Sequence, residues 1–189
     1  MSNTTASIDV AVLIGSLRAT SISRKLAHAV SALAPKSLSL RIVEIGELPL
    51  YNFDLETAEP PARWVKFREE IKRADALLFI TPEFNRSIPG ALKNAIDVGS
   101  RPKGASVWKG KPGGVISQSP GRIGGFGANH HLRQSLAGVD VAVMPFPETY
   151  IGFSEKVLAD DGSWTDPDAR ALLVDFMKSF ETWVGRFGG

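Results

Sequence analysis

Four short apolar runs along the chain have the pattern of buried β-strands. They span Ile8 to Ile14, Ala76 to Thr81, Gly113 to Ser119 and Asp140 to Met144. Each run ends at polar, glycine or proline residues, and continuous apolar runs of this length are typical of strands covered on both faces. Residues 38–45 instead roughly alternate, with Leu38, Leu40 and Ile42 on one face, which predicts a strand at the edge of a sheet.

Helical periodicity fills the gaps between these strands. Apolar side chains recur every three to four residues, or glycine and proline mark the ends, in the segments 22–33, 64–71, 89–99, 129–138 and from 166 onward. The last segment has the clearest start, because Asp166 can act as the N-cap and Pro167 suits the first helical position.

Strands and helices therefore alternate five times along one chain. This order predicts an α/β fold, a flavodoxin-like five-stranded parallel sheet of order 2-1-3-4-5 with helices on both faces, in a single domain spanning residues 1–189. In such sheets, ligands bind beyond the carboxyl ends of the strands, where the strand order reverses. That rule selects three loops, residues 15–23, 82–89 and 117–127, as the candidate binding site.

Composition and charge limit the classes of function. The 189 residues are 43% hydrophobic and 22% charged, which is typical of a soluble globular protein. The sequence contains no cysteine, which excludes disulfides and thiolate metal sites and favours the cytoplasm. A net charge of +2 does not indicate a nucleic-acid binder, and no segment is long enough to cross a bilayer, so we expect neither partner. Acidic residues are nevertheless missing from residues 10–43 and 98–139, which predicts an anion-attracting surface.

The first loop has the chemistry of a phosphate site. It carries the hydroxyls of Ser16, Ser21 and Ser23 and the guanidinium of Arg18 at the start of a predicted helix, whose unpaired amides and dipole favour an anion. The loop matches neither Gly-x4-Gly-Lys-Ser/Thr nor Gly-x-Gly-x-x-Gly. A loop with one glycine and several side-chain donors suits a terminal monophosphate, which favours FMN over ATP or tightly held NAD. The alternative is that one serine caps the helix and the others are solvated.

The second and third loops could hold a flavin ring. Pro82-Glu83-Phe84-Asn85 combines a rigid residue, an aromatic face and an amide, the lining that an isoalloxazine ring needs. In the third loop, Gly121, Gly124, Gly125 and Gly127 allow the backbone to approach a ligand closely. Each loop alone could be a helix cap or a flexible connection, but three such loops at one end of a sheet predict a binding site.

These motifs resemble the NAD(P)H-dependent FMN reductase family, and they are most similar to its chromate and quinone reductases. The resemblance rests on Gly15-Ser16-Leu17-Arg18 with Ser21 and Ser23, and on Pro82-Glu83-Phe84-Asn85 with Ser87, Pro89, Leu92, Lys93, Asn94, Ala95 and Asp97. It extends over about residues 8 to 185. It implies noncovalent FMN, NAD(P)H as co-substrate, and a homo-oligomer, a dimer or a homotetramer, in which a neighbouring subunit helps to enclose the flavin.

The resemblance also implies which residues bind the cofactor. Ser16, Arg18, Ser21 and Ser23 would bind the phosphate, with Ile22 between the last two serines. The residues that would line the flavin ring are Pro82, Glu83, Phe84, Asn85 and Ser87. Those that would close the other side of the ring are Ser117, Ser119, Gly121 and Gly124. Many members of the family have asparagine in place of Ser23 and tyrosine in place of Phe84. Ser23 can still donate to a phosphate, whereas Phe84 offers no hydroxyl.

The activity implied is a ping-pong oxidoreduction. NAD(P)H passes a hydride to flavin N5 and leaves, and a quinone, or chromate or a similar metal oxyanion, then takes the electrons. Because the flavin carries this chemistry, we expect no catalytic side chain and no metal site. Arg101 follows the third predicted helix and is a candidate for binding the phosphate of NAD(P)H or an oxyanion substrate. The alternative is a solvated arginine at a helix end.

Two other functions stay open from the sequence. An electron-carrier flavodoxin shares the fold, but such carriers tend to be acidic, whereas this chain has a pI near 9.0. A flavin-free nucleotide- or phosphosugar-binding regulatory module could use the same first loop, and a colourless protein would indicate it. Away from the loops, we expect His28 at the surface and the acidic run of Asp54, Glu56 and Glu59 in a solvated loop.

Overall fold

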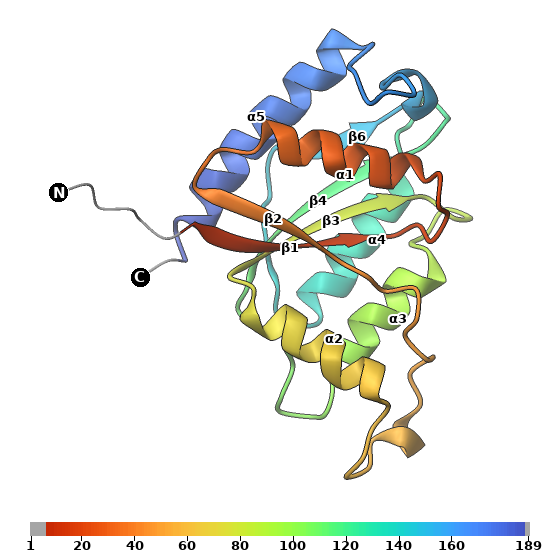
Figure 1. Cartoon of the computed structure of the whole chain (residues 1–189), viewed down its shortest axis with the longest axis vertical. Helices are drawn as coiled ribbons and strands as arrows, with labels where there is room; N and C mark the ends of the chain where they lie inside the picture. Colours follow the sequence, from red (N-terminus) through yellow and green to blue (C-terminus); the bar gives the residue numbers. More distant parts are fainter. Residues whose placement is uncertain (1–6, 188–189) are drawn as a thin grey trace, which may run out of the picture.

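The computed structural model describes residues 7–187 and has a parallel sheet at its centre (Figure 1). Its main strands are β1 (Ile8–Ile14), β2 (Leu38–Val43), β3 (Ala76–Pro82), β4 (Pro112–Gln118) and β5 (Ala142–Val143). They are ordered β2-β1-β3-β4-β5, and every pair is parallel. The predicted strand order is therefore confirmed, with β2 at an edge as its alternating pattern indicated.

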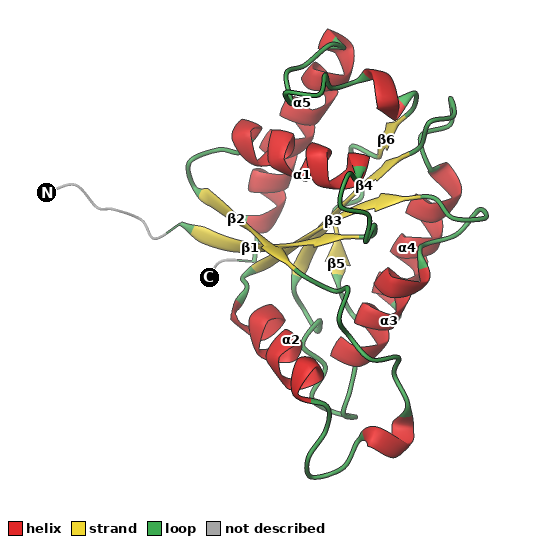
Figure 2. Cartoon of the chain, turned by 45° about the vertical axis from the view of Figure 1, so that its right-hand side comes forward, coloured by secondary structure: helices red, strands yellow, loops and turns green. Residues whose placement is uncertain are grey.

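A sixth strand, which the sequence did not predict, continues the outer edge of the sheet. Strand β6 (Thr149–Ile151) pairs with the end of β4, whereas β5 pairs only with its first two residues. The predicted strand 140–144 is thus shortened to two residues, and the chain leaves the sheet before it returns as β6 (Figure 2). Pro145 and Pro147 lie in this interruption, and proline cannot donate a ladder hydrogen bond.

Within the described residues, five α-helices cover the two faces of the sheet. They are α1 (Ile22–Leu33), α2 (Ala62–Arg73), α3 (Gly90–Gly99), α4 (Phe126–Ala137) and α5 (Pro167–Val184), with short 3-10 turns η1 (Phe53–Leu55) and η2 (Ser154–Lys156). Helices α1 and α5 pack on one face, and α2, α3 and α4 pack on the other (Figure 1). Alternate strand residues follow this division, since Leu13 and Phe79 join one core and Val12 and Leu78 join the other. Within residues 7–187, no helix combines the length and the apolar composition needed to cross a membrane.

Local sequence signals predict the start of helix α5 correctly but not the start of helix α4. Helix α5 begins as predicted, because Asp166 Oδ1 accepts hydrogen bonds from the amides of Asp168 and Ala169 at 3.0 Å each. Helix α4 begins at Phe126, three residues before the predicted start at Asn129. Its N-cap is Gly125, which has a φ of 77°, a left-handed conformation that glycine adopts readily.

Two buried polar side chains fasten the long connection between β2 and α2. Asn94 Oδ1 accepts a hydrogen bond from the Tyr51 amide at 2.7 Å, and its amide group donates to two carbonyls of the same segment. Arg68 donates to the Val98 carbonyl at 2.9 Å and forms an ion pair with Glu56. The expected solvated position is therefore wrong for Glu56, whose side chain is only 9% exposed because α2 brings Arg68 against it.

Candidate functional site

The three predicted loops emerge next to one another at the carboxyl ends of β1, β3 and β4. These strands are neighbours in the sheet, and their last residues are in register, with Ile14 opposite Ile80 and Pro82 opposite Gln118. Figure 1 shows the three connections leaving the same end of the sheet. The structure therefore brings together the loops that the sequence selected from chain order alone.

The first loop turns closely against β3 before α1 begins. A Cβ atom at Gly15 would lie 2.5 Å from Thr81 Oγ1, so only glycine fits where the loop leaves the sheet. Ser21 is the N-cap of α1, and its Oγ accepts a hydrogen bond from the Arg24 amide at 3.3 Å. Capping uses Ser21 as an acceptor and leaves its hydroxyl proton for a ligand. Ser16, in the same loop, is 7% exposed.

The positively charged residues around the first loop differ in whether they form an ion pair. Arg24 makes two 2.8 Å hydrogen bonds to the Glu44 carboxylate, which raise the pKa of Arg24 and lower the pKa of Glu44. Lys25 pairs with Asp160 at 3.0 Å. Arg18 is exposed, and in the part of the chain that the structure describes it has no acidic partner. It lines a hollow of about 220 Å³ together with Lys25, Glu155 and Asp160. Among Arg18, Arg24 and Lys25, Arg18 is thus the cation whose charge is not already paired.

The second loop is a tight turn held against α4. Phe84 and Ser87 exchange two backbone hydrogen bonds of 2.9 Å. Glu83 Oε2 accepts from the Ala128 amide at 3.0 Å, and Ser87 Oγ lies 2.7 Å from His131 Nδ1. Glu83 and Ser87, both assigned to the ring, thus fasten the loop to α4. At the tip of the loop, Phe84 and Asn85 are exposed, and they remain free to line a ligand.

The third loop uses its serines to hold its own backbone. Ser117 is fully buried and donates to the Gly124 carbonyl at 2.8 Å, while Ser119 donates to the Gly121 carbonyl at 3.1 Å. Gly124 has a φ of 66°, and a Cβ there would lie 2.7 Å from the Tyr150 carbonyl carbon. This loop therefore has its shape set by Ser117 and Gly124, and Gly121 lies on its exposed side.

An aromatic cluster flanks the third loop at the start of α4. The Tyr150 hydroxyl donates to Glu148 Oε2 at 2.6 Å and lies 2.9 Å from His130 Nε2, and the Phe126 ring packs against His130. Burial, and then the hydrogen bond to Glu148, raise the pKa of Tyr150 to about 12. His130 and His131 contact different partners, as adjacent helical residues should.

The Tyr150 phenol is expected to lose its proton only near pH 12. Losing the proton would place a phenolate beside the Glu148 carboxylate, so Glu148→Gln should shift the midpoint part of the way toward the ordinary value of about 10. The sequence has 2 tyrosines, so a Tyr51→Phe background leaves one signal for titration of the phenolate absorbance. Circular dichroism checks that the fold persists, and a midpoint unmoved by Glu148→Gln would contradict the coupling.

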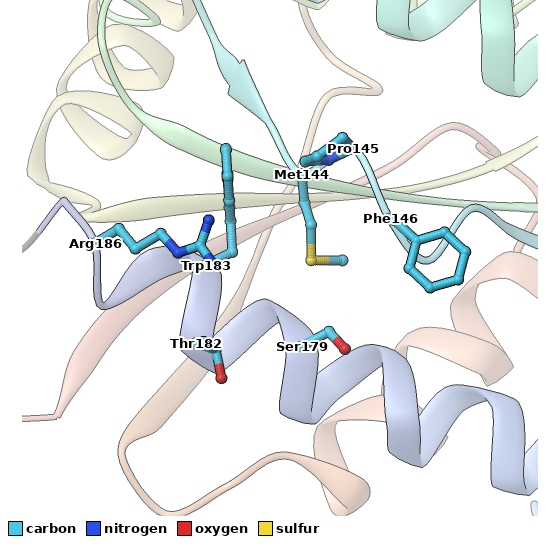
Figure 3. Close-up of a pocket in the computed structure, with 7 residues that line it drawn as sticks. All are labelled: Met144, Pro145, Phe146, Ser179, Thr182, Trp183 and Arg186. Atoms are coloured by element: carbon cyan, nitrogen blue, oxygen red, sulfur yellow. The ribbon is translucent and has the colours of Figure 1, made fainter.

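Two features lie away from the three loops. A hollow of about 270 Å³ separates α5 from the chain after β5, lined by Met144, Pro145, Phe146, Ser179, Thr182, Trp183 and Arg186 (Figure 3). None of the predicted site residues lines it. Arg101 lies in another hollow, with Lys109 and Asp140, next to the start of β4. Within one chain, Arg101 is therefore at the opposite end of the sheet from the loops.

Three residues of this region were not named from the sequence, although Gln118 lies within the selected loop 117–127. Gln118, Asn129 and Ser154 are buried and bond to the loops, and Gln118 contacts Ser23, which is itself fully buried. Their partners lie between 12 and 95 residues away in the chain, so no local spacing indicates them.

The fold and the loops define a doubly wound α/β protein with a candidate mononucleotide site at the point where the strand order reverses. The hydroxyls of Ser16 and Ser21, the charge of Arg18 and the amides that begin α1 suit a phosphate monoester. The exposed Phe84 ring and the Asn85 amide beside it suit a planar, partly polar ring. This donor set fits FMN.

Comparison with known proteins identifies the family. The family model for NADPH-dependent FMN reductase matches residues 8–156. The chain is 57% identical over 175 residues to a quinone reductase of Pseudomonas putida, covering 93% of this chain and 94% of that protein. It is 38% identical over 182 residues to an NAD(P)H-dependent FMN reductase of Pseudomonas aeruginosa, with 96% and 98% coverage. The structure of FerB, a flavoenzyme NAD(P)H:(acceptor) oxidoreductase from Paracoccus denitrificans, matches with a TM-score of 0.90 and 42% identity over 96% of this chain and all of that one.

The chain belongs to the NADPH-dependent FMN reductase family. This membership confirms the resemblance found in the sequence. It also confirms the expectation of an enzyme that uses FMN and NAD(P)H.

Proposed function

We propose that this protein is an FMN-dependent oxidoreductase that oxidises NAD(P)H and reduces quinones. The observation that carries the proposal is Arg18, which has no acidic partner within residues 7–187 and shares with Ser16 and Ser21 the loop at the carboxyl end of β1. The loop that carries the exposed Phe84 leaves the neighbouring strand β3. The 57% identity to a quinone reductase supports the choice of acceptor. When bound, FMN supplies the hydride and electron chemistry that links NAD(P)H to a quinone.

The side chains of the site bind and orient rather than react. Arg18, Ser16 and Ser21 would hold the phosphate, while Pro82, Phe84 and Asn85 would line the ring. Glu83 and Ser87 keep the second loop in place through α4, and Ser117 does the same for the third loop. The glycine at position 121 would let backbone approach the ring from that side.

We further propose a cytoplasmic homo-oligomer, a dimer or tetramer, in which a neighbouring subunit covers part of each site. Several large apolar side chains at or near the loops are about half exposed, namely Leu17, Phe84, Ile123 and Phe126. Apolar surface of this kind is commonly buried between subunits. Chromate or a similar metal oxyanion is proposed as an additional acceptor, since the reduced site would be open to small oxidants.

Arg101→Ala is expected to weaken the use of NAD(P)H while the FMN content stays unchanged. Because Arg101 lies at the far end of its own sheet, it can act only on the site of a neighbouring subunit. Loss of one charge-assisted contact should raise the KM for NADPH by about tenfold or more. Lys103→Ala is the control, since it removes one positive charge from the same exposed segment. Unchanged kinetics in Arg101→Ala would remove this residue from the site.

The function is tested by purifying the protein without added cofactor and identifying any released flavin. The bound flavin should be reduced anaerobically by NADH or NADPH, and steady NAD(P)H consumption should depend on an added quinone. A flavin that neither nicotinamide reduces would favour an electron-carrier flavodoxin. A colourless protein that fails to take up FMN would favour a flavin-free nucleotide-binding module.

A further inference from the structure

A chain of three buried polar side chains runs beneath the first loop. Ser154 Oγ donates to Gln118 Oε1 at 2.6 Å, and Gln118 Nε2 donates to Ser23 Oγ at 3.0 Å. Ser154 is 2% exposed, Gln118 is 5% exposed and Ser23 is 0% exposed. They belong to η2, to the last position of β4 and to the second position of α1, so one amide group links three separate elements.

The backbone fixes where this amide group points. Ser119 donates its amide proton to the Ile151 carbonyl at 3.0 Å, and the Ser154 amide donates to the Ser119 carbonyl at 3.1 Å. Both bonds are made by Ser119, the residue after Gln118, and they hold the end of β4 against β6 and η2. The Gln118 side chain therefore extends from a rigid base to Ser23.

Ser23 is in the wrong place to touch a ligand on the outer side of the loop. Its side chain is fully buried, and its oxygen already accepts a proton from Gln118. Ser21 is the N-cap two residues earlier, and the first amides of α1 lie between these serines. Moving Ser23 would therefore move the donors that face a phosphate.

We propose that Gln118 is a positioning residue for the phosphate of the cofactor. Through Ser23, it holds the first turn of α1 where Ser21 and the helix amides reach the phosphate, and Ser154 fixes the orientation of its amide. The inference rests on the proposed FMN function. It predicts that this buried chain contributes to the preference for FMN over riboflavin, which has the same ring but no phosphate.

Gln118→Met tests the proposal, because methionine has a similar length and no hydrogen-bonding amide. The measurement is the dissociation constant of the full-length apoprotein for FMN and for riboflavin, from quenching of flavin fluorescence. FMN affinity should fall about fivefold to tenfold, the effect of about one hydrogen bond, with riboflavin affinity changed by less than about twofold. Ser154→Ala should act in the same direction, and Ser154→Thr, which keeps the hydroxyl, should restore FMN affinity.

A double-mutant cycle with Ser23→Ala separates positioning from direct contact. If Gln118 acts through Ser23, the double variant should bind FMN no more weakly than Gln118→Met alone. Additive losses would show that Ser23 contacts the phosphate by itself and would overturn the proposal. Equal losses for both flavins, accompanied by a lower Tm, would indicate only a structural role and would also overturn it.

Flavin binding by the parent protein shows whether a negative result concerns the role of Gln118 or the proposed function itself. A parent that binds FMN, with variants that bind it equally well, would refute the role of Gln118 alone. A parent apoprotein that binds neither flavin would refute the proposed function, and the inference with it. If Gln118→Met fails to fold, the Ser154→Ala and Ser154→Thr pair gives the same comparison.

Discussion

Arg18→Ala is expected to produce a folded protein that loses most of its FMN during purification. The neighbouring cations are already paired, Arg24 with Glu44 and Lys25 with Asp160, so they cannot replace its charge. A charge-assisted hydrogen bond to a phosphate contributes enough that its loss should weaken FMN binding by about 10- to 100-fold. Riboflavin binding should change little, because riboflavin has no phosphate for Arg18 to bind.

Fluorescence titration of the apoprotein with both flavins measures this effect. Arg170→Ala provides the matched control, because Arg170 is exposed on α5 and the substitution makes the same change in net charge. The control should bind FMN like the parent. An Arg18→Ala protein that retained FMN as firmly as the control would contradict the assignment of the first loop to the phosphate.

Gly124→Ala should cause the largest loss of stability among the substitutions considered. Its φ of 66° is strained for alanine, and the new methyl group would lie 2.7 Å from the Tyr150 carbonyl carbon and 2.8 Å from the Ile151 nitrogen. Both contacts are backbone atoms of β6, so the third loop must shift. Strain and overpacking together should lower the free energy of unfolding by about 3 kcal/mol.

Gly162→Ala separates the two causes, because Gly162 has a φ of 83° but a Cβ added there would have no neighbouring atom within 4 Å. It should lose only about 1 kcal/mol, the cost of the backbone conformation. Chemical denaturation followed by circular dichroism gives both values. Similar losses for the two variants would show that the close approach of Gly124 to β6 contributes nothing.

Most of the fold was predictable because its signals are local. Runs that are apolar on both faces mark β1, β3 and β4, and Asp166 with Pro167 marks the start of α5. Strand β6 was missed because it has only three residues, which follow an interruption by prolines and are too few to show the alternation typical of a strand. Helix α4 was placed too late because its first turn follows Gly125 and contains Gly127, which read as loop.

The meeting of the three candidate loops was predictable, but the direction of their side chains was not. Chain order alone brings the ends of three neighbouring strands together. Whether Glu83 faces a ligand or the amide of Ala128 depends on a residue 45 positions later in the chain. Ser23 likewise turns toward Gln118, 95 positions away, so sequence spacing gives no sign of that hydrogen bond.

The interruption between β5 and β6 also affects how molecules can associate. A long unpaired strand at the rim of a sheet is a template for another chain, and it favours aggregation. Here the rim consists of segments of two and three residues separated by Pro145 and Pro147, so it offers no continuous row of amides. Copies of this protein are therefore not expected to extend the sheet across the β5 and β6 rim.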